Sequence, residues 1–219
     1  MQNSDGLQDD FGPGSPEELS LPPWEQRETY GFLNGLYLSI KGVLLAPGQF
    51  FRRMPTRLGL AQPLFFAVVL GVAAAFFSWM WTLTGSSMQV LLQENLKEAV
   101  RAPIYSFFGF LFSPVLVAIG VALKAGIIHL ALMVVGGNRL GFEATFRVAA
   151  YGEATSILAL LPFCGSVIGT LWAVVVTVIG LYSIHATEPW KAVVAVLAPT
   201  LLCLAATGGA LSLLLIGLN

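Results

Sequence analysis

The sequence predicts an all-α membrane protein with five transmembrane helices and a cytoplasmic amino-terminal amphipathic helix. Of its 219 residues, 56% are hydrophobic and only 11% are charged, and the mean hydropathy is +0.79. Soluble domains carry about 25% charged residues, so this chain lacks the polar surface that a water-soluble protein needs. Several apolar runs also reach the roughly 18 to 20 residues that a membrane-spanning helix requires.

Residues 1–24 are rich in Pro, Gly, Ser, Asp and Glu and hold few large apolar side chains. Such a segment cannot bury enough surface to offset the entropy of ordering. It also lacks the apolar core of a signal peptide. We therefore expect a disordered acidic tail in the cytoplasm.

Residues 25–62 are expected to form an interfacial amphipathic segment. Apolar side chains recur at helical spacing between 32 and 44, and Pro47 with Gly48 should end that helix or turn it sharply. Aromatic rings beside basic groups suit the headgroup layer of a membrane. The candidate membrane-surface contacts are Lys41, Phe50, Phe51, Arg52 and Arg53. Packing of the same helix on the protein's own cytoplasmic face is an equal alternative.

Residues 63–216 should hold the five spans. The expected spans are 63–83, 107–135, 148–161, 167–184 and 192–216. Tryptophans in "SWMWTL" at the end of the first span fit an interfacial belt. The third span is short and is broken by "LPFCGS".

The distribution of basic residues predicts the orientation. The chain has 11 Lys and Arg residues. On this topology eight lie on the amino-terminal side: Arg27, Lys41, Arg52, Arg53, Arg57, Arg139, Arg147 and Lys191. Only Lys97 and Arg101 lie on the other side. The positive-inside rule then places the amino terminus in the cytoplasm and the carboxyl terminus outside.

Five ionisable residues lie in or beside the predicted spans. They are the intramembrane polar candidates Lys124, His129, Arg147, Glu153 and His185. At about 1.5 Å per residue, His129 lies roughly 9 Å and Glu153 roughly 8 Å from the cytoplasmic boundary, with Lys124 at roughly 16 Å. We therefore expect a His129–Glu153 contact, extended to His185, and find no partner for Lys124, which faces about 140° away from His129.

Two interpretations of these groups remain open. Ionisable groups inside a membrane are functional candidates by default, in a pathway for protons, ions or lipid headgroups. Alternatively, the pair locks two helices together and Lys124 donates to carbonyl groups freed near Pro114 or Pro162.

Enzyme signatures are missing from the sequence. It contains no H-E-x-x-H zinc motif and no G-x-S-x-G nucleophile elbow, and "GGNRLG" lacks the lysine of a phosphate-binding loop. We expect no enzyme activity, catalytic residue, metal or cofactor. The net charge of −1 and the absence of a basic tail give no indication of nucleic-acid binding.

Three stretches together resemble a known family: "SIKGVLLAPGQFFRRM", "GGNRLGFEATFRVAAYGEAT" and "LLPFCGSVIGTLWAVVVTVIGLYSIHATEPWKAVVAVLAP". The resemblance is to the Yip family of Rab-GTPase-interacting integral membrane proteins, in its bacterial form, over residues 32–199. It rests on the order and spacing of Arg147, Tyr151, Pro162, Gly165, Trp172, Gly180, His185 and Lys191.

This resemblance implies five spans and a cytoplasmic amino terminus. In eukaryotes the family is linked to vesicle traffic and membrane shaping through small GTPases, a partner that a bacterial member lacks. The resemblance supplies no catalytic residues.

Our first functional hypothesis is therefore a non-enzymatic protein of the bacterial cytoplasmic membrane that organises or shapes the bilayer, or scaffolds partners. Its expected partners are the lipid bilayer with its anionic headgroups, an unknown protein, and further copies of the chain. The alternative is a small transporter or channel component that uses Lys124, His129 and Glu153.

Overall fold

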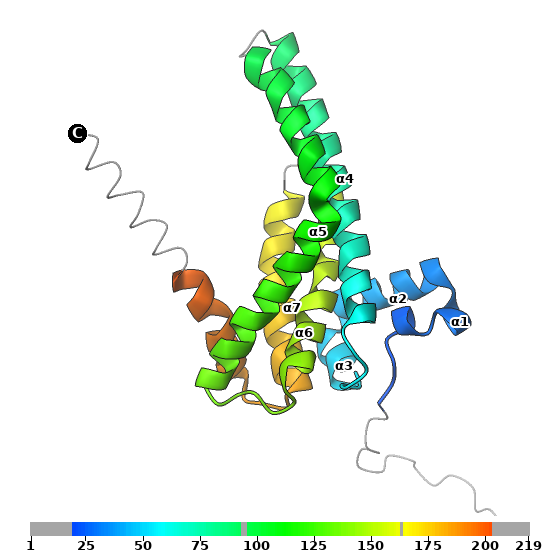
Figure 1. Cartoon of the computed structure of the whole chain (residues 1–219), viewed down its shortest axis with the longest axis vertical. Helices are drawn as coiled ribbons and strands as arrows, with labels where there is room; N and C mark the ends of the chain where they lie inside the picture. The colour runs from blue at the N-terminus through cyan, green and yellow to red at the C-terminus, as the bar shows by residue number, and fades with distance from the viewer. Residues whose placement is uncertain (1–18, 93–95, 163, 203–219) are drawn as a thin grey trace, which may run out of the picture.

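A computed structural model describes residues 19–92, 96–162 and 164–202 (Figure 1), and these residues form helices and loops without strands. The elements in chain order are η1 (Pro23–Glu25), α1 (Arg27–Tyr30), α2 (Phe32–Leu45), α3 (Pro47–Arg52), α4 (Ala61–Leu91), α5 (Leu96–Val134), α6 (Phe142–Tyr151), η2 (Gly152–Leu160) and α7 (Gly165–Ile184). A further apolar helix follows at Pro189–Leu202. The all-α prediction is confirmed for this part of the chain.

Three of these helices are long and apolar enough to cross a membrane: Ala61–Met88 in α4, Val100–Val134 in α5, and α7. They contain the predicted span 63–83 and all but the last residue of the predicted span 107–135, and α7 contains the predicted span 167–184. We call the end of the bundle where α4 begins and α5 and α7 end the base. The opposite end, where the α4–α5 hairpin turns, is the tip (Figure 1).

The hairpin of α4 and α5 is held by close packing of small and aromatic residues. A Cβ added to Gly71 of α4 would lie only 2.4 Å from a methyl of Val117, so the glycine allows the two helices to approach. Nearer the tip, Trp79 of α4 stacks on Phe110 of α5 with their planes 8° apart. Trp79, predicted to mark an interface belt, therefore also holds the hairpin together.

The third predicted span, 148–161, falls in α6 and η2. The helix begins six residues earlier than expected, at Phe142, and changes to 3₁₀ geometry at Gly152. The 3₁₀ form rises about 2.0 Å per residue and the α form about 1.5 Å. The 19 residues together therefore extend about 33 Å, which matches the roughly 30 Å of a bilayer's hydrocarbon core.

The fifth predicted span, 192–216, begins within the helix Pro189–Leu202, and its residues after 202 lie outside the described part of the chain. The count of five spans stays a prediction.

The amino-terminal segment packs on the bundle. Its predicted break is observed: α2 ends at Leu45, and α3 starts at Pro47. The fully buried Phe51 of α3 lies against α7 at Gly180, where an added Cβ would meet the phenyl ring at 2.9 Å. Most of the predicted tail lies outside the described residues, but Trp24, its last residue, is fully buried.

Candidate functional site

Polar side chains of α6 and η2 take part in three separate clusters, and each cluster also contains residues from other parts of the chain. Glu143, Arg147 and Tyr151 follow one another at intervals of four residues, which places them on one face of a helix. Thr145 points to a second cluster and Glu153 to a third, as their contacts below establish. The α6–η2 segment therefore contributes a residue to all three polar clusters.

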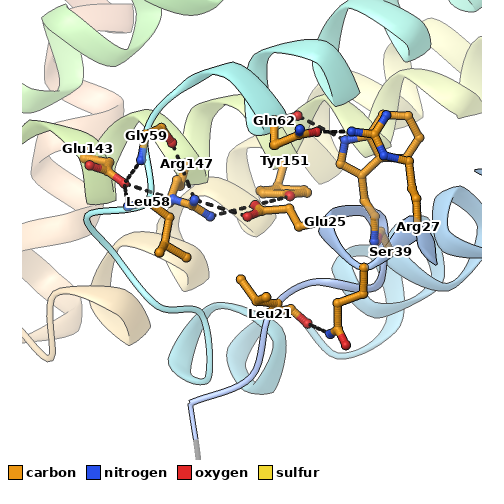
Figure 2. Close-up of polar contacts among 12 residues, drawn as sticks. Leu21, Glu25, Arg27, Ser39, Leu58, Gly59, Gln62, Glu143, Arg147 and Tyr151 are labelled. Atoms are coloured by element: carbon orange, nitrogen blue, oxygen red, sulfur yellow. Dashed lines mark hydrogen bonds and ion pairs between the residues drawn. The ribbon is translucent and has the colours of Figure 1, made fainter. Parts of the chain in front are cut away.

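The first cluster surrounds Arg147, whose side chain is fully buried. Its guanidinium donates to both carboxylate oxygens of Glu25, at 2.7 and 3.3 Å. The hydroxyl of Tyr151 donates to the same carboxylate at 2.6 Å (Figure 2). A buried charge is tolerated only when it is paired and hydrogen-bonded, and here Glu25 of η1 completes the pairing.

Glu143 extends this cluster to the loop before α4. Its carboxylate accepts from the backbone N–H groups of Leu58 and Gly59, at 2.6 and 3.0 Å, and from Arg147 at 3.4 Å (Figure 2). Gly59 has a φ of +90°, a conformation that side chains disfavour. Burial opposes the charge of Glu143, but these donors outweigh it and lower the carboxyl pKa below its usual value.

Next to this cluster, Trp24 ties the amino-terminal segment to α2 and α4. Its backbone N–H donates to the Ser39 hydroxyl at 2.9 Å, and its indole N–H donates to the Gln62 carbonyl at 3.0 Å. The guanidinium of Arg27 lies 4.7 Å from the indole centroid and donates to the Gln62 side chain. Trp24 and Glu25 together fix residues 20–30 on the base.

The second cluster is a chain of hydrogen bonds from His185 through Thr145 to His129. Nδ1 of His185 faces the backbone N–H groups of Arg139 and Leu140, at 3.3 and 3.2 Å, so it must be the unprotonated acceptor. The proton is then on Nε2, which donates to Thr145 Oγ1 at 3.0 Å. The threonine hydroxyl is also hydrogen-bonded to His129 Nδ1, at 3.2 Å.

The environment of His185 favours the neutral ring. Two effects lower the pKa of His185 to about 4: burial is the larger, and the nearby charge of His129 is the smaller. The ring therefore stays uncharged at neutral pH and closes the loop between α5 and α6 onto the end of α7.

The third cluster is an ion pair between Lys124 of α5 and Glu153 of η2. This corrects two predictions: Glu153 does not contact His129, and Lys124 does have a partner. The reason is the early start of α6. Phe142, the first residue of α6, and Val134, the last residue of α5, both lie at the base. Glu153 follows Phe142 by 11 residues, or about 17 Å, and Lys124 precedes Val134 by about 15 Å. The two are therefore level, and His129 is level with Thr145.

The structure brings only some of the predicted membrane-surface residues to the surface. Lys41, Arg52 and Arg53 are exposed. Phe51 is fully buried, which contradicts its predicted contact with headgroups. Phe50 is half-buried and packs edge-on against Tyr151, with 5.4 Å between ring centroids. Phe51 turns inward at Gly180 of α7, which leaves space for its ring, and the Phe50 ring lies against Gly42 of α2.

Sequence reasoning missed Glu25, Glu143 and Thr145 as site residues. The spacing of Glu143, Arg147 and Tyr151 was a usable signal for a polar helix face. No local pattern could reveal Glu25, which is 122 residues from Arg147 in the chain. Within the described ranges, no three His, Cys, Asp or Glu side chains gather as a metal site would need.

Comparison with known proteins gives one family. A model of the Yip1 domain matches residues 41–210, which is most of the chain and includes α6, η2 and α7. Neither the curated proteins nor the solved structures contain a match. The resemblance inferred from the sequence is thus confirmed: this chain is an integral membrane protein that belongs to the Yip1 domain family.

Proposed function

We propose that this protein is a non-enzymatic organiser of the bilayer that bends the membrane around it. The observation that carries the proposal is the taper of the described chain in Figure 1. The short helices α1, α2, α3 and α6 lie around the lower part of the bundle, whereas only the α4–α5 hairpin reaches the tip. The helices α1, α2 and α3 at the base would add their area to one leaflet only.

The exposed side of α2 would add to this asymmetry. Its large apolar side chains Phe32, Leu33, Tyr37 and Leu45 are 45%, 76%, 60% and 74% exposed. Helices with exposed apolar side chains beside polar ones insert into the boundary between headgroups and acyl chains, and their binding depends on curvature. Inserted beside the base, α2 widens the same leaflet that the base already expands.

The basic residues support an orientation with the base in the cytoplasm. The side that holds α1–α3 and the loop before α6 carries eight of the 11 Lys and Arg residues, as the positive-inside rule requires. Basic groups near an anionic leaflet each contribute on the order of 1 kcal/mol of attraction, which would hold the base against the lipid. The protein would then make the cytoplasmic leaflet convex.

Vesicle reconstitution tests this proposal. Purified full-length protein is incorporated into vesicles of one anionic lipid mixture at increasing protein-to-lipid ratios, and vesicle diameters are measured by cryo-electron microscopy. We expect diameters to fall as the ratio rises. The double variant Leu33→Gln/Tyr37→Gln, which changes two exposed residues on one face of α2, should reduce this effect.

Leu58→Gln is the matched control, because Leu58 is also exposed (53%) but lies in the loop before α4. It should behave like the wild type. Wild-type vesicles with the same diameters as protein-free vesicles at every ratio would refute the proposal.

A further inference from the structure

The Lys124–Glu153 pair is open to its surroundings at the level of the membrane. The two side chains retain 35% and 24% exposure, and the pair lies about 15 Å from the base, near half the depth of a roughly 30 Å hydrocarbon core. Glu153 stands at the start of η2, a 3₁₀ segment of nine residues, although such segments rarely exceed three or four residues. An ion pair with a purely structural role would be closed off by packing, because exposure to lipid is costly.

An open pocket of about 300 Å³ adjoins Glu153, bordered by η2, α4 and the first half of α7. Its hydroxyl groups include those of Thr155, Ser156 and Thr170. Each of these hydroxyls already donates its proton to a backbone carbonyl, of Gly152, Leu70 and Ser166 respectively. Because these hydroxyl protons are already used, the three oxygens can only accept from a further ligand, and together with the Glu153 carboxylate they favour a ligand rich in N–H donors.

An apolar groove of about 620 Å³ adjoins Lys124 on the other side of the pair. It lies between α5, α7 and the helix Pro189–Leu202, and its apolar lining includes Ile127, Val174 and Val196. Thr170 and Ala173 line both the groove and the pocket next to Glu153, so the two spaces meet beside the ion pair. One ligand could therefore contact both charges and the apolar groove together.

We propose that this site binds a zwitterionic phospholipid with a primary amine in its headgroup. The ammonium donates to Glu153 and the hydroxyl oxygens, the phosphate accepts from Lys124, and an acyl chain lies in the apolar groove. The two protein charges sum to zero, so a zwitterion replaces the ion pair without leaving a charge unpaired. An anionic lipid leaves Glu153 without a partner, and a choline headgroup has no N–H to donate. This site does not depend on the taper and goes beyond the bilayer-bending function.

Competitive lipid retention tests the proposal. The full chain is purified from an equimolar mixture of phosphatidylethanolamine, phosphatidylcholine and phosphatidylglycerol, and bound lipid is counted by native mass spectrometry. We expect the wild type to favour phosphatidylethanolamine by about tenfold, the ratio that a difference of about 1.4 kcal/mol produces. Glu153→Gln should bring the three lipids close to parity. Lys124→Met should lower the retention of all three.

Glu188→Gln is the matched control, because Glu188 pairs with Lys191 at 3.6 Å outside the three candidate spans. It should keep the wild-type preference. The exchange Lys124→Glu/Glu153→Lys restores an ion pair, so it should recover the melting temperature lost in the single variants but not the preference for the amine headgroup. That pair of readouts separates lipid binding from a purely structural role even if a single variant folds poorly.

Equal retention of the three lipids by the wild type would overturn the proposal. So would a preference that persists in both Glu153→Gln and the exchanged pair. Retention that is the same in the wild type and every variant would also overturn it.

Discussion

Arg147 shows how a single buried charge fixes the amino-terminal segment. The residue is 0% exposed and pairs with Glu25 and Glu143. Tyr151 donates to the same Glu25 carboxylate. Breaking a buried ion pair from one side leaves the other charge without a partner, whereas replacing both partners with apolar groups can be nearly neutral. The cluster therefore stabilises the protein only as a unit.

Removing Arg147 should release the amino-terminal segment. We expect Arg147→Met to lower the unfolding free energy by about 3 to 5 kcal/mol, because it strands the Glu25 carboxylate. The double variant Glu25→Met/Arg147→Met should recover part of that loss, and the recovery measures the coupling. Thermal unfolding in detergent gives both values. Arg139→Met, which changes an exposed arginine near the base, should have little effect, and equal losses in the two arginine variants would contradict this account.

His185 should make the stability depend on pH. Its pKa is about 4 in the folded protein and 6.5 ordinarily, so between these values the unfolded chain binds more protons. Stability should then be constant above pH 6.5 and fall as the pH drops from 6.5 towards 4. The measurement is the melting temperature between pH 8 and pH 4.5.

Other groups also titrate in that range, so the comparison is with His185→Gln. The glutamine amide oxygen can accept from the backbone of Arg139 and Leu140 but does not titrate. Its melting temperature should fall less steeply with acid than that of the wild type. Parallel curves would show that His185 is not the group responsible.

At the scale of elements, the contact between α3 and α7 depends on one glycine. A Cβ at Gly180 would lie 2.7 Å from a methyl of Val148 and 2.9 Å from the Phe51 ring. Real Cβ atoms do not approach this closely, so α3, α6 or α7 would have to move. The glycine thus decides where three elements meet at the base.

The variant Gly180→Ala should therefore lower the melting temperature. Gly120→Ala is its control in α5, since nothing lies within 4 Å of the added carbon there. Alanine favours a helix over glycine by up to about 1 kcal/mol, so the control should melt at the same or a slightly higher temperature. A Gly180→Ala protein that melts like the control would mean that the base is not packed tightly at this point.

At the scale of the whole molecule, base and tip should face opposite compartments. In a background where Cys164 and Cys203 are replaced by Ser, a membrane-impermeant maleimide should label Ser87→Cys near the tip in intact spheroplasts. Arg139→Cys at the base should be labelled only after the membrane is permeabilised. Labelling in the opposite order would reverse the orientation proposed for the bilayer-bending function.

The sequence predicts the helical membrane class and the three long apolar helices. Composition and the length of an apolar run are properties of each segment by itself, so they need no knowledge of tertiary contacts. The Lys124–Glu153 pair was not, although both residues were singled out. A shift of six residues in the start of α6 moves a side chain by about 9 Å along the axis, which is enough to exchange one partner for another.

The sequence alone determined that this chain is a polytopic α-helical membrane protein of the Yip type, with its polar candidates near residues 124 to 185. Only the tertiary structure decided that Glu25 pairs with Arg147, that Phe51 turns inward and that Glu153 meets Lys124. The physical reason is that hydropathy is a property of each segment, whereas the partner of a buried charge depends on the register between helices and on where a glycine lets them approach.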